Sequence, residues 1–341
     1  MADPTPPAAT PTPKDTTFRA FTTTQGASYA QHRLNYHPRL YGHVLDYHSA
    51  TGGQFNLLVD VGCGPGMAVR TLAPHFKAGG AVGLDPSEGM VETARKILEA
   101  DLVEAEEAAA ADGGEKKEIA KVRFEVATLE EAAAKEEIGL AEGSVDLITA
   151  ATAAHWFDMT TFWPTAARLL KPRGSVALWC GSGVVVDQSE PQGTAIQEAL
   201  DRFEVALDEY MMPGNRTARW GYRDLVLPWM LEGEAGENAK AFEEGELLRK
   251  EWGVGEGLEP IDQFYFTPTD RPARLDVLVG ILATTSPYIR WKEANGGDAG
   301  TERDPLQVMR AAMEKPFEEL KAAGSRLKGG VGGVLLVLKK A

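Results

Sequence analysis

The chain has 341 residues, 43% of them hydrophobic, and is therefore long enough to bury a core as one large domain or two smaller ones. Its 50 acidic residues outnumber its 35 basic ones, giving a net charge of −15. This charge argues against nucleic acid or an anionic membrane as a partner, because phosphate groups are held mainly by Lys and Arg. Two cysteines give no disulfide framework, no apolar run approaches the ~18 residues of a membrane span, and no signal peptide is recognisable. We expect a cytoplasmic protein, monomeric or homodimeric.

The N-terminal region divides into two parts. Residues 1–17 are mostly Pro, Thr and Ala with little to bury, which predicts a disordered tail. Residues 18–50 carry aromatic and histidine side chains at mixed spacing. They predict one or two helices that lie over the ligand end of the core.

The run LLVDVGCGPG at residues 57–66 is the most informative feature of the chain, because an apolar strand leads directly into a glycine-rich turn. Glycine is needed where the backbone adopts left-handed angles or approaches a ligand closely. A second apolar run ends at Asp85, nineteen residues after Gly66. An acid at the end of that strand is placed to accept hydrogen bonds from ribose hydroxyls. The spacing is G-x-G-x-G rather than the G-x-G-x-x-G of dinucleotide binders, which favours a ligand without a pyrophosphate.

Four pieces in this order resemble the motifs of class I S-adenosylmethionine-dependent methyltransferases. The pieces are DVGCGPG at 60–66, DPSEGM at 85–90, SVDLIT at 144–149 and LLKPRG at 169–174 followed by SVALW at 175–179. The resemblance implies S-adenosylmethionine as cofactor and methyl transfer as activity.

Within this class the chain resembles the trans-aconitate methyltransferase-like group through two further stretches. One is AHWFD at 154–158, and the other is YAQHRLNYHP at 29–38, which follows a Y-x-x-x-R-x-x-Y-x-P pattern. Leu34 departs from that pattern, since the group often has proline there. The similarity covers about residues 25–185 and becomes patchy beyond, where we expect substrate choice to be determined.

The pattern of elements predicts an α/β fold with a Rossmann-like, seven-stranded, mostly parallel sheet, helices on both faces and a helical cap. Strands and helices alternate between residues 55 and 179, which is typical of βαβ units. The helix after Asp85 has apolar residues at helical spacing, namely Met90, Ala94, Ile97, Leu98 and Leu102. The remaining expectations are a third strand at 122–127, a sixth at 261–267, helices at about 275–292 and 305–323, and a last, antiparallel strand at 331–339.

We expect a methyltransferase core at 18–185 that includes the N-terminal lid helices. Residues 186–258 show no alternation of strands and helices and predict a helical cap or substrate region. Residues 259–341 would complete the sheet and the cap.

The resemblance also assigns roles to residues of the cofactor site. Asp85 would accept from the ribose, Asp60 would orient the ammonium group, and Gly62 and Gly64 would let the backbone approach the methionyl portion. Other expected contacts are Tyr29 and Arg33 at the amino-acid end, Leu129 beside the adenine, and Ala150 at the end of the fourth strand. Asp60 could instead be a strand-end acid that caps the turn.

Two residues after the fourth strand are candidates for catalysis. The aromatic face of Trp156 could line the sulfonium, because it attracts a cation, or Trp156 could simply pack in the core. His155 could act as a base if the acceptor is a hydroxyl. A carboxylate acceptor is already ionised near neutral pH, so catalysis would reduce to positioning and desolvation. His155 could also be purely structural.

An acidic substrate would need basic residues within the acidic chain. Arg219 and Arg223, with Trp220 between them, are the candidates for substrate binding, although charges at helical spacing are more often a solvated face. The histidines at 32, 37, 43 and 48 match no zinc pattern, so we expect no metal.

The sequence therefore predicts a methyltransferase that acts on a small molecule, most simply at a carboxylate oxygen such as that of trans-aconitate or a secondary-metabolite acid. The alternatives are a hydroxyl or amine acceptor, or a non-catalytic S-adenosylmethionine-binding module. A nicotinamide oxidoreductase would share the sheet, but the missing third glycine and the stretches around Asp146 and at 169–174 argue against it.

Overall fold

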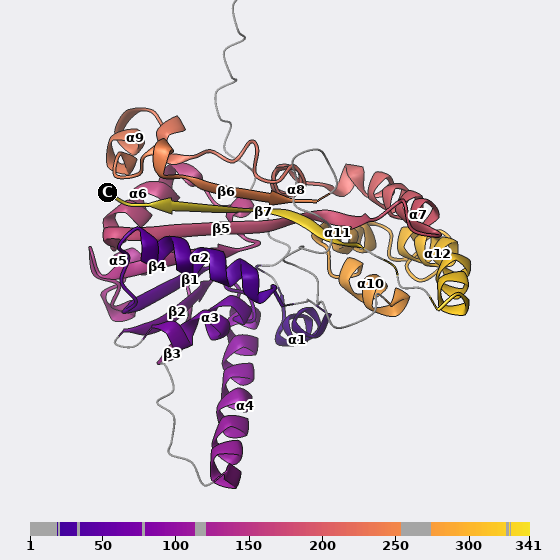
Figure 1. Cartoon of the computed structure of the whole chain (residues 1–341), viewed down its shortest axis with the longest axis horizontal. Coiled ribbons are helices and arrows are strands. Elements are labelled where there is room, and N and C mark those ends of the chain that lie inside the picture. Colours follow the sequence, from indigo (N-terminus) through magenta and orange to yellow (C-terminus); the bar gives the residue numbers. More distant parts are fainter. Residues whose placement is uncertain are drawn as a thin grey trace, which may run out of the picture.

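A single seven-stranded sheet forms the centre of the protein, seen in a computed structural model that describes residues 19, 21–32, 35–76, 79–112, 121–253, 274–324, 327 and 329–341 (Figure 1). Its strand order is β3-β2-β1-β4-β5-β7-β6. The strands are β1 (Leu57–Val61), β2 (Gly80–Asp85), β3 (Val122–Val126), β4 (Val145–Ala151), β5 (Leu170–Val186), β6 (Leu248–Trp252) and β7 (Gly329–Lys339). Strands β1 to β5 pair in parallel, and β7 is antiparallel to both of its neighbours. The predicted Rossmann-like sheet with one antiparallel strand near its edge is confirmed.

Helices cover both faces of this sheet. One face packs against α2 (Pro38–Ala50), α3 (Met67–Leu72) and α4 (Glu88–Asp112). The other packs against α5 (Leu129–Ala134), α6 (Met159–Leu169) and α9 (Gly233–Ala239). Strands buried on both faces consist mainly of apolar residues, as β4 does. None of the helices in the described residues has the length and apolar character that crossing a membrane requires.

Of the apolar residues expected on one face of helix α4, Met90 and Ala94 are buried, with Ala94 in the apolar core that packs on the sheet, whereas Ile97, Leu98 and Leu102 are half-buried. Its C-terminal part projects away from the sheet in Figure 1.

A group of helices lies beyond the ends of β5 and β7 in Figure 1. It consists of α7 (Gly193–Ala206), α10 (Leu275–Leu282), α11 (Ser286–Ala294) and α12 (Pro305–Ala322), which share a separate apolar core. The long pairing of β5 with β7 reaches this group, because it continues to Val186 and Gly329. This group of helices thus has its own core and is joined to the sheet by the two longest strands.

Two expectations about the C-terminal half need correction. Residues 186–258 are not purely helical, because β6 lies within them. The middle of this edge strand is the charged run RKE at 249–251, so its sequence lacks the alternation of apolar and polar residues that is typical of a strand. The helix expected over 275–292 is divided into α10 and α11, because Pro287 lacks the N–H that a continuous helix needs. The strand predicted at 261–267 and the tail at 1–17 lie outside the described residues.

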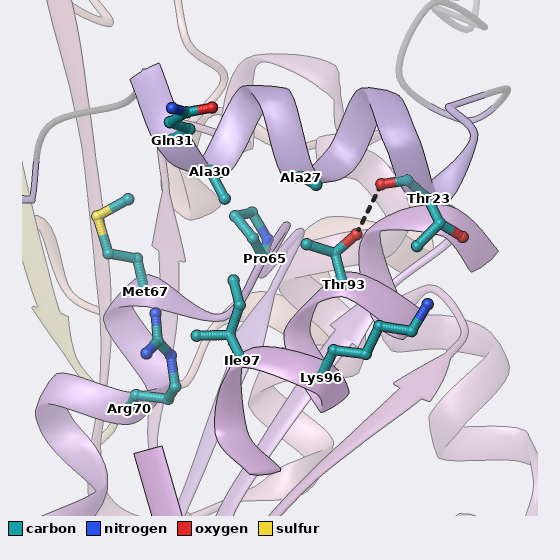
Figure 2. A pocket seen from close by; sticks show the side chains of 10 residues that line it. All are labelled: Thr23, Ala27, Ala30, Gln31, Pro65, Met67, Arg70, Thr93, Lys96 and Ile97. Atoms are coloured by element: carbon teal, nitrogen blue, oxygen red, sulfur yellow. Dashed lines mark hydrogen bonds between the residues drawn. The ribbon is translucent and has the colours of Figure 1, made fainter. Parts of the chain in front are cut away.

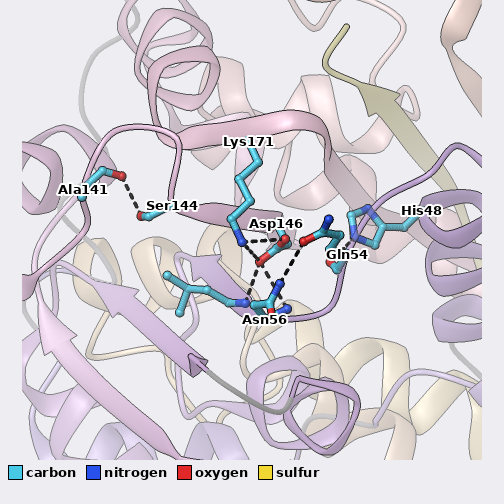
Figure 3. A network of polar contacts seen from close by, with 8 residues as sticks. His48, Gln54, Asn56, Ala141, Ser144, Asp146 and Lys171 are labelled. Atoms are coloured by element: carbon cyan, nitrogen blue, oxygen red, sulfur yellow. Dashed lines mark hydrogen bonds and ion pairs between the residues drawn. The ribbon is translucent and has the colours of Figure 1, made fainter.

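The amino-terminal ends of the central strands are joined by a buried acid, Asp146 (Figure 3). Its Oδ2 accepts hydrogen bonds from the backbone N–H of Leu57 (2.8 Å) and of Asn56 (3.2 Å). The ammonium group of Lys171 lies 2.9 and 2.8 Å from its two oxygens. These contacts link the starts of β1, β4 and β5, which indicates a structural role for this acid.

Candidate active site

The turn between β1 and α3 owes its shape to three glycines in the left-handed region. Gly62, Gly64 and Gly66 have φ values of 66°, 52° and 79°. A Cβ on Gly62 would lie 2.5 Å from the Ala153 side chain, and one on Gly66 would lie 2.5 Å from the Phe124 ring. A Cβ on Gly64 would meet no atom within 4 Å. Packing therefore requires Gly62 and Gly66, whereas Gly64 faces open space where a ligand could approach the backbone.

Asp85, at the end of β2, holds this turn in place. Its Oδ2 accepts from the backbone N–H of Gly64 (2.9 Å), and its Oδ1 accepts from that of Ser87 (2.8 Å). Burial raises the pKa of the carboxyl, and these two hydrogen bonds and the positive charge of Arg19 oppose that rise. Each carboxylate oxygen can accept more than one hydrogen bond, so Asp85 keeps accepting capacity for hydroxyl groups.

Asp60, near the end of β1, is completely buried and only half satisfied. Its Oδ1 accepts from the Thr149 hydroxyl at 2.6 Å. Its Oδ2 has no hydrogen-bond partner among the described residues. Burial raises the pKa of this carboxyl to about 7; the Thr149 bond opposes the rise and the charge of Asp85 adds to it. A buried acceptor without a donor is unfavourable, so its presence at a ligand-binding edge points to a donor supplied by a ligand.

Aromatic side chains line the same face of the sheet. Asp60 is in register with Thr149, and Trp179 with Ala151, so these side chains project from one face. The Trp179 ring lies 5.5 Å from that of Tyr36 and 6.1 Å from that of Tyr41. The Trp179 indole N–H is the second buried polar group without a partner in the described part of the chain. Sequence reasoning did not assign a role to Tyr41 or Trp179.

Tyr36 is also joined to the end of β4. Its hydroxyl lies 3.1 Å from that of Thr152, a β-branched residue with a φ of 57°. Such a conformation is strained and persists only where its surroundings fix it. Tyr36 belongs to the Y-x-x-x-R-x-x-Y-x-P pattern, which was the available signal for its position.

The N-terminal segment lies over α4. Helix α1 (Thr23–His32) packs closely there, since a Cβ on Gly26 would lie 2.6 Å from the Thr93 hydroxyl. Tyr29 is half-buried on this helix, with its ring 6.4 Å from that of Phe21. The predicted contact Arg33 lies outside the described residues.

A cavity of about 420 Å³ lies between α1, α3 and α4 (Figure 2). Its lining includes Pro65 of the glycine turn together with Arg70 and Lys96, but neither Asp60 nor Asp85. It is therefore a groove beside the turn and not the space that the two carboxylates face.

Two further predicted contacts are buried in the core. Leu129 is the first residue of α5, behind a capping box formed by Thr128 and Glu131. Ala150 lies in β4 beside Leu178 of β5.

His155 and Trp156 lie in a short 3₁₀ turn (Ala154–Trp156) in the loop that follows β4. Nδ1 of His155 lies 3.3 Å from the Tyr222 hydroxyl, and its ring lies 4.8 Å from that of Trp156. The helix α8 (Pro213–Arg219) packs on both residues, because a Cβ on Gly214 would lie 2.5 Å from the His155 carbonyl oxygen and 2.7 Å from the Trp156 ring.

The predicted substrate-binding residues do not gather into one basic pocket. Arg219 forms an ion pair with Glu204 of α7, and Arg223 lies 3.9 Å from Glu251 of β6. The Arg223 side chain is 74% exposed and Trp220 is 54% exposed. Each arginine thus has a different acidic neighbour, which sequence spacing could not reveal.

Comparison with known proteins supports the interpretation of the glycine turn. A family model described as a methyltransferase domain matches residues 59–178. A Dictyostelium discoideum protein named as a methyltransferase is 31% identical over 222 residues, which are 65% of this chain and 69% of that protein. A Saccharomyces cerevisiae protein named as an S-adenosylmethionine-dependent methyltransferase is 27% identical over 155 residues, and this match spans 46% of this chain but only 45% of the yeast protein.

The fold comparison agrees. A solved structure from Anaeromyxobacter dehalogenans, named as a type II methyltransferase, superposes with a TM-score of 0.52 at 20% identity, covering 90% of this chain and 96% of that one. The strand order with its antiparallel β7, the buried carboxylates at the glycine turn and the Dictyostelium relative lead to one assignment. The chain belongs to the class I S-adenosylmethionine-dependent methyltransferases.

Proposed function

We propose that the protein transfers a methyl group from S-adenosylmethionine to a carboxylate oxygen of a small acid. The observation that carries the cofactor part is the unpaired, buried Oδ2 of Asp60 beside a turn that exposes the backbone at Gly64. An ammonium group is the donor that such an acceptor lacks, and the methionyl end of the cofactor carries one. The resemblance to the trans-aconitate group supports the acid as acceptor.

The residues present fit this cofactor. Asp85 would accept from the ribose hydroxyls while it holds the turn, Gly64 would leave room for the methionyl portion, and Gly62 would allow the turn to pack closely enough to present it. Tyr29, Leu129 and Ala150 remain proposed contacts, and Arg33 remains one by resemblance alone. Bound S-adenosylmethionine would supply an activated methyl group, which passes to the acceptor oxygen as the carbon–sulfur bond breaks and its electron pair remains on sulfur.

The acceptor side would lie between the end of β4 and the cap. His155 and Trp156 would orient the acid there and exclude water, under the helix α8 that packs on them. A carboxylate is ionised near neutral pH, so no base is required. Arg219 and Arg223 could attract an anion only by exchanging their present partners, Glu204 and Glu251.

Calorimetric titration of the purified protein with S-adenosylhomocysteine tests the cofactor part. We expect one site per chain and a markedly weaker affinity for Asp60→Asn. If S-adenosylhomocysteine does not bind to the wild-type protein, the proposed cofactor is wrong, and the proposed activity with it.

A methyl-transfer screen tests the acceptor. We expect turnover of small polycarboxylic acids, with trans-aconitate as the first probe. Turnover of phenols or amines instead would replace the acid by another acceptor, and tight binding without any turnover would indicate a non-catalytic module.

A further inference from the structure

A buried tyrosine lies behind His155, contributed by a turn 67 residues later in the sequence. Tyr222 is 1% exposed, and its hydroxyl lies 3.3 Å from Nδ1 of His155. Its backbone is left-handed, with a φ of 58°, directly after Gly221 with a φ of 62°. A bulky residue in this region is strained, and strain of this kind is concentrated at functional sites. The chain therefore maintains an unfavourable turn that places this hydroxyl against His155.

Neighbouring elements hold the turn in place. The N–H of Tyr222 donates to the Thr217 carbonyl at 3.0 Å, and the N–H of Gly221 donates to that of Ala218 at 3.0 Å. The guanidinium group of Arg249 on β6 donates to the Gly221 carbonyl at 2.7 Å. Tyr222 is thus fixed from α8 and from the sheet, and its hydroxyl has little freedom to leave His155.

The direction of the Tyr222–His155 hydrogen bond follows from the groups around the hydroxyl. Burial, and next the neighbouring Cys180, raises the pKa of Tyr222 far above its usual range, so the hydroxyl keeps its proton. The backbone N–H of His155 interacts with the hydroxyl oxygen. The Cys180 thiol is a weak acceptor, and its own S–H is directed at the Ala218 carbonyl, 3.6 Å away. The Tyr222 hydroxyl also has a side-chain hydrogen bond with Cys180, but an imidazole nitrogen is a stronger acceptor than a thiol sulfur, so Nδ1 of His155 is the better acceptor for the Tyr222 proton.

We propose that Tyr222 is a positioning residue that holds His155 as the Nε2–H tautomer, so that His155 meets the methyl acceptor as a hydrogen-bond donor and not as a general base. In a neutral imidazole one nitrogen accepts and the other donates, so an Nδ1 that accepts from Tyr222 leaves the proton on Nε2. The two nitrogens lie on opposite sides of the ring, so Nε2 points away from Tyr222.

This inference rests on the proposed function. It limits the methyl acceptor to groups that need not lose a proton, such as a carboxylate. A donor at this position can hold one oxygen of a carboxylate while the other oxygen forms the bond to the methyl carbon. The acceptor then has no proton to lose, and the sulfur keeps the electron pair of the broken bond. A hydroxyl acceptor would need a base here, which an Nε2–H tautomer is not.

The tautomer can be read directly from the full-length protein. We would label histidine with ¹⁵N, record long-range ¹H–¹⁵N spectra at neutral pH with and without S-adenosylhomocysteine, and assign His155 by its absence in His155→Gln. The expected result is a single Nε2–H tautomer in the wild-type protein. An Nδ1–H tautomer would overturn the proposal, because Tyr222 would then be the acceptor and Nε2 a base.

Tyr222→Phe tests whether the hydroxyl sets the tautomer, since it keeps the buried ring. We expect His155 to lose its single tautomer, with S-adenosylhomocysteine affinity within about twofold of wild type because no proposed cofactor contact is changed. An unchanged His155 spectrum would refute the role of Tyr222, and if this variant does not fold, the wild-type spectrum still decides the tautomer. Failure of the wild-type protein to bind S-adenosylhomocysteine would refute the proposed function instead, a result obtained separately from the same sample.

Discussion

The two ends of the central sheet each bury an aspartate, and the two carboxylates differ in how many of their oxygens have hydrogen-bond partners. At the amino-terminal end Asp146 is surrounded by donors, namely the ammonium group of Lys171 and two backbone N–H groups. At the carboxyl end Asp60 has one hydroxyl donor and an oxygen with no partner among the described residues. The contacts of Asp146 join three strands, whereas Asp60 keeps one oxygen that can still accept a hydrogen bond from a ligand. In an open α/β sheet ligands bind at the carboxyl ends, which is where the unsatisfied acid lies.

Asp146→Ala should produce the largest effect on stability. The substitution leaves two backbone N–H groups and the partly exposed Lys171 ammonium without their acceptor, and each buried donor left unsatisfied costs about 1–3 kcal/mol. We expect the free energy of unfolding, measured by urea denaturation, to fall by about 2–6 kcal/mol. The folded fraction should bind S-adenosylhomocysteine as the wild type does, and a large loss of affinity there would contradict the contrast between the two ends.

Asp60→Asn should produce the largest effect on binding. It removes the charge that would pair with the ammonium group, and a hydrogen bond to a charged group contributes about 1.5–3 kcal/mol. We expect the dissociation constant for S-adenosylhomocysteine to rise roughly tenfold to a hundredfold by calorimetry.

Thr149→Val is the matched control for Asp60, because it removes the donor to Oδ1 and leaves Oδ2 in place. It should weaken ligand binding less than Asp60→Asn does. Equal losses in the two variants would mean that the whole buried pair, and not its unpaired oxygen, governs binding.

A pair of glycine substitutions separates folding from binding within the turn. Gly64→Ala adds a methyl group to open space, so its cost in stability is the left-handed strain, about 1–2 kcal/mol. Gly66→Ala adds the same strain and a clash with the Phe124 ring. We expect Gly66→Ala to lower the melting temperature more and Gly64→Ala to lose ligand affinity relative to its small loss of stability. The reverse order would show that Gly64 does not face the ligand.

The sequence predicted the turn and its two carboxylates because these features are local. The glycine run, Asp60 and Asp85 lie on consecutive βα units whose ends must meet at one edge of the sheet. Contacts between distant segments were not predictable in this way. Tyr36 meets Thr152 across 116 positions, and Tyr222 meets His155 across 67. Neither contact has a spacing or a periodicity that would reveal it.

The same distinction explains the misassigned C-terminal elements. Strand β6 has only five residues, is charged in its middle and lies at the edge of the sheet, so its sequence shows no alternation. Its place is determined by pairing with β7, which begins far along the chain. The acidic partners of Arg219 and Arg223 come from α7 and β6, and they too became visible only with the tertiary structure.

The last expected effect concerns the pH dependence of stability in the ligand-free protein. The pKa of Asp60 is raised to about 7 in the folded state, well above its ordinary value of 3.8. A group with a raised folded-state pKa contributes stability that is present below the unfolded pKa and is lost as pH rises through the folded pKa. The wild-type protein should therefore lose stability relative to Asp60→Asn as pH rises from about 4 to about 7, the interval between the unfolded and the folded pKa of this carboxyl.

Urea denaturation of both proteins at a series of pH values measures this difference. Saturating S-adenosylhomocysteine should remove most of it, because an ammonium group against Oδ2 would favour the ionised carboxylate and lower its pKa. If the free energy of unfolding of the wild type and of Asp60→Asn changes with pH in the same way, the charge of Asp60 must already be compensated by another group. The unpaired oxygen would then be a feature of packing, and the contrast with Asp146 would no longer indicate a ligand.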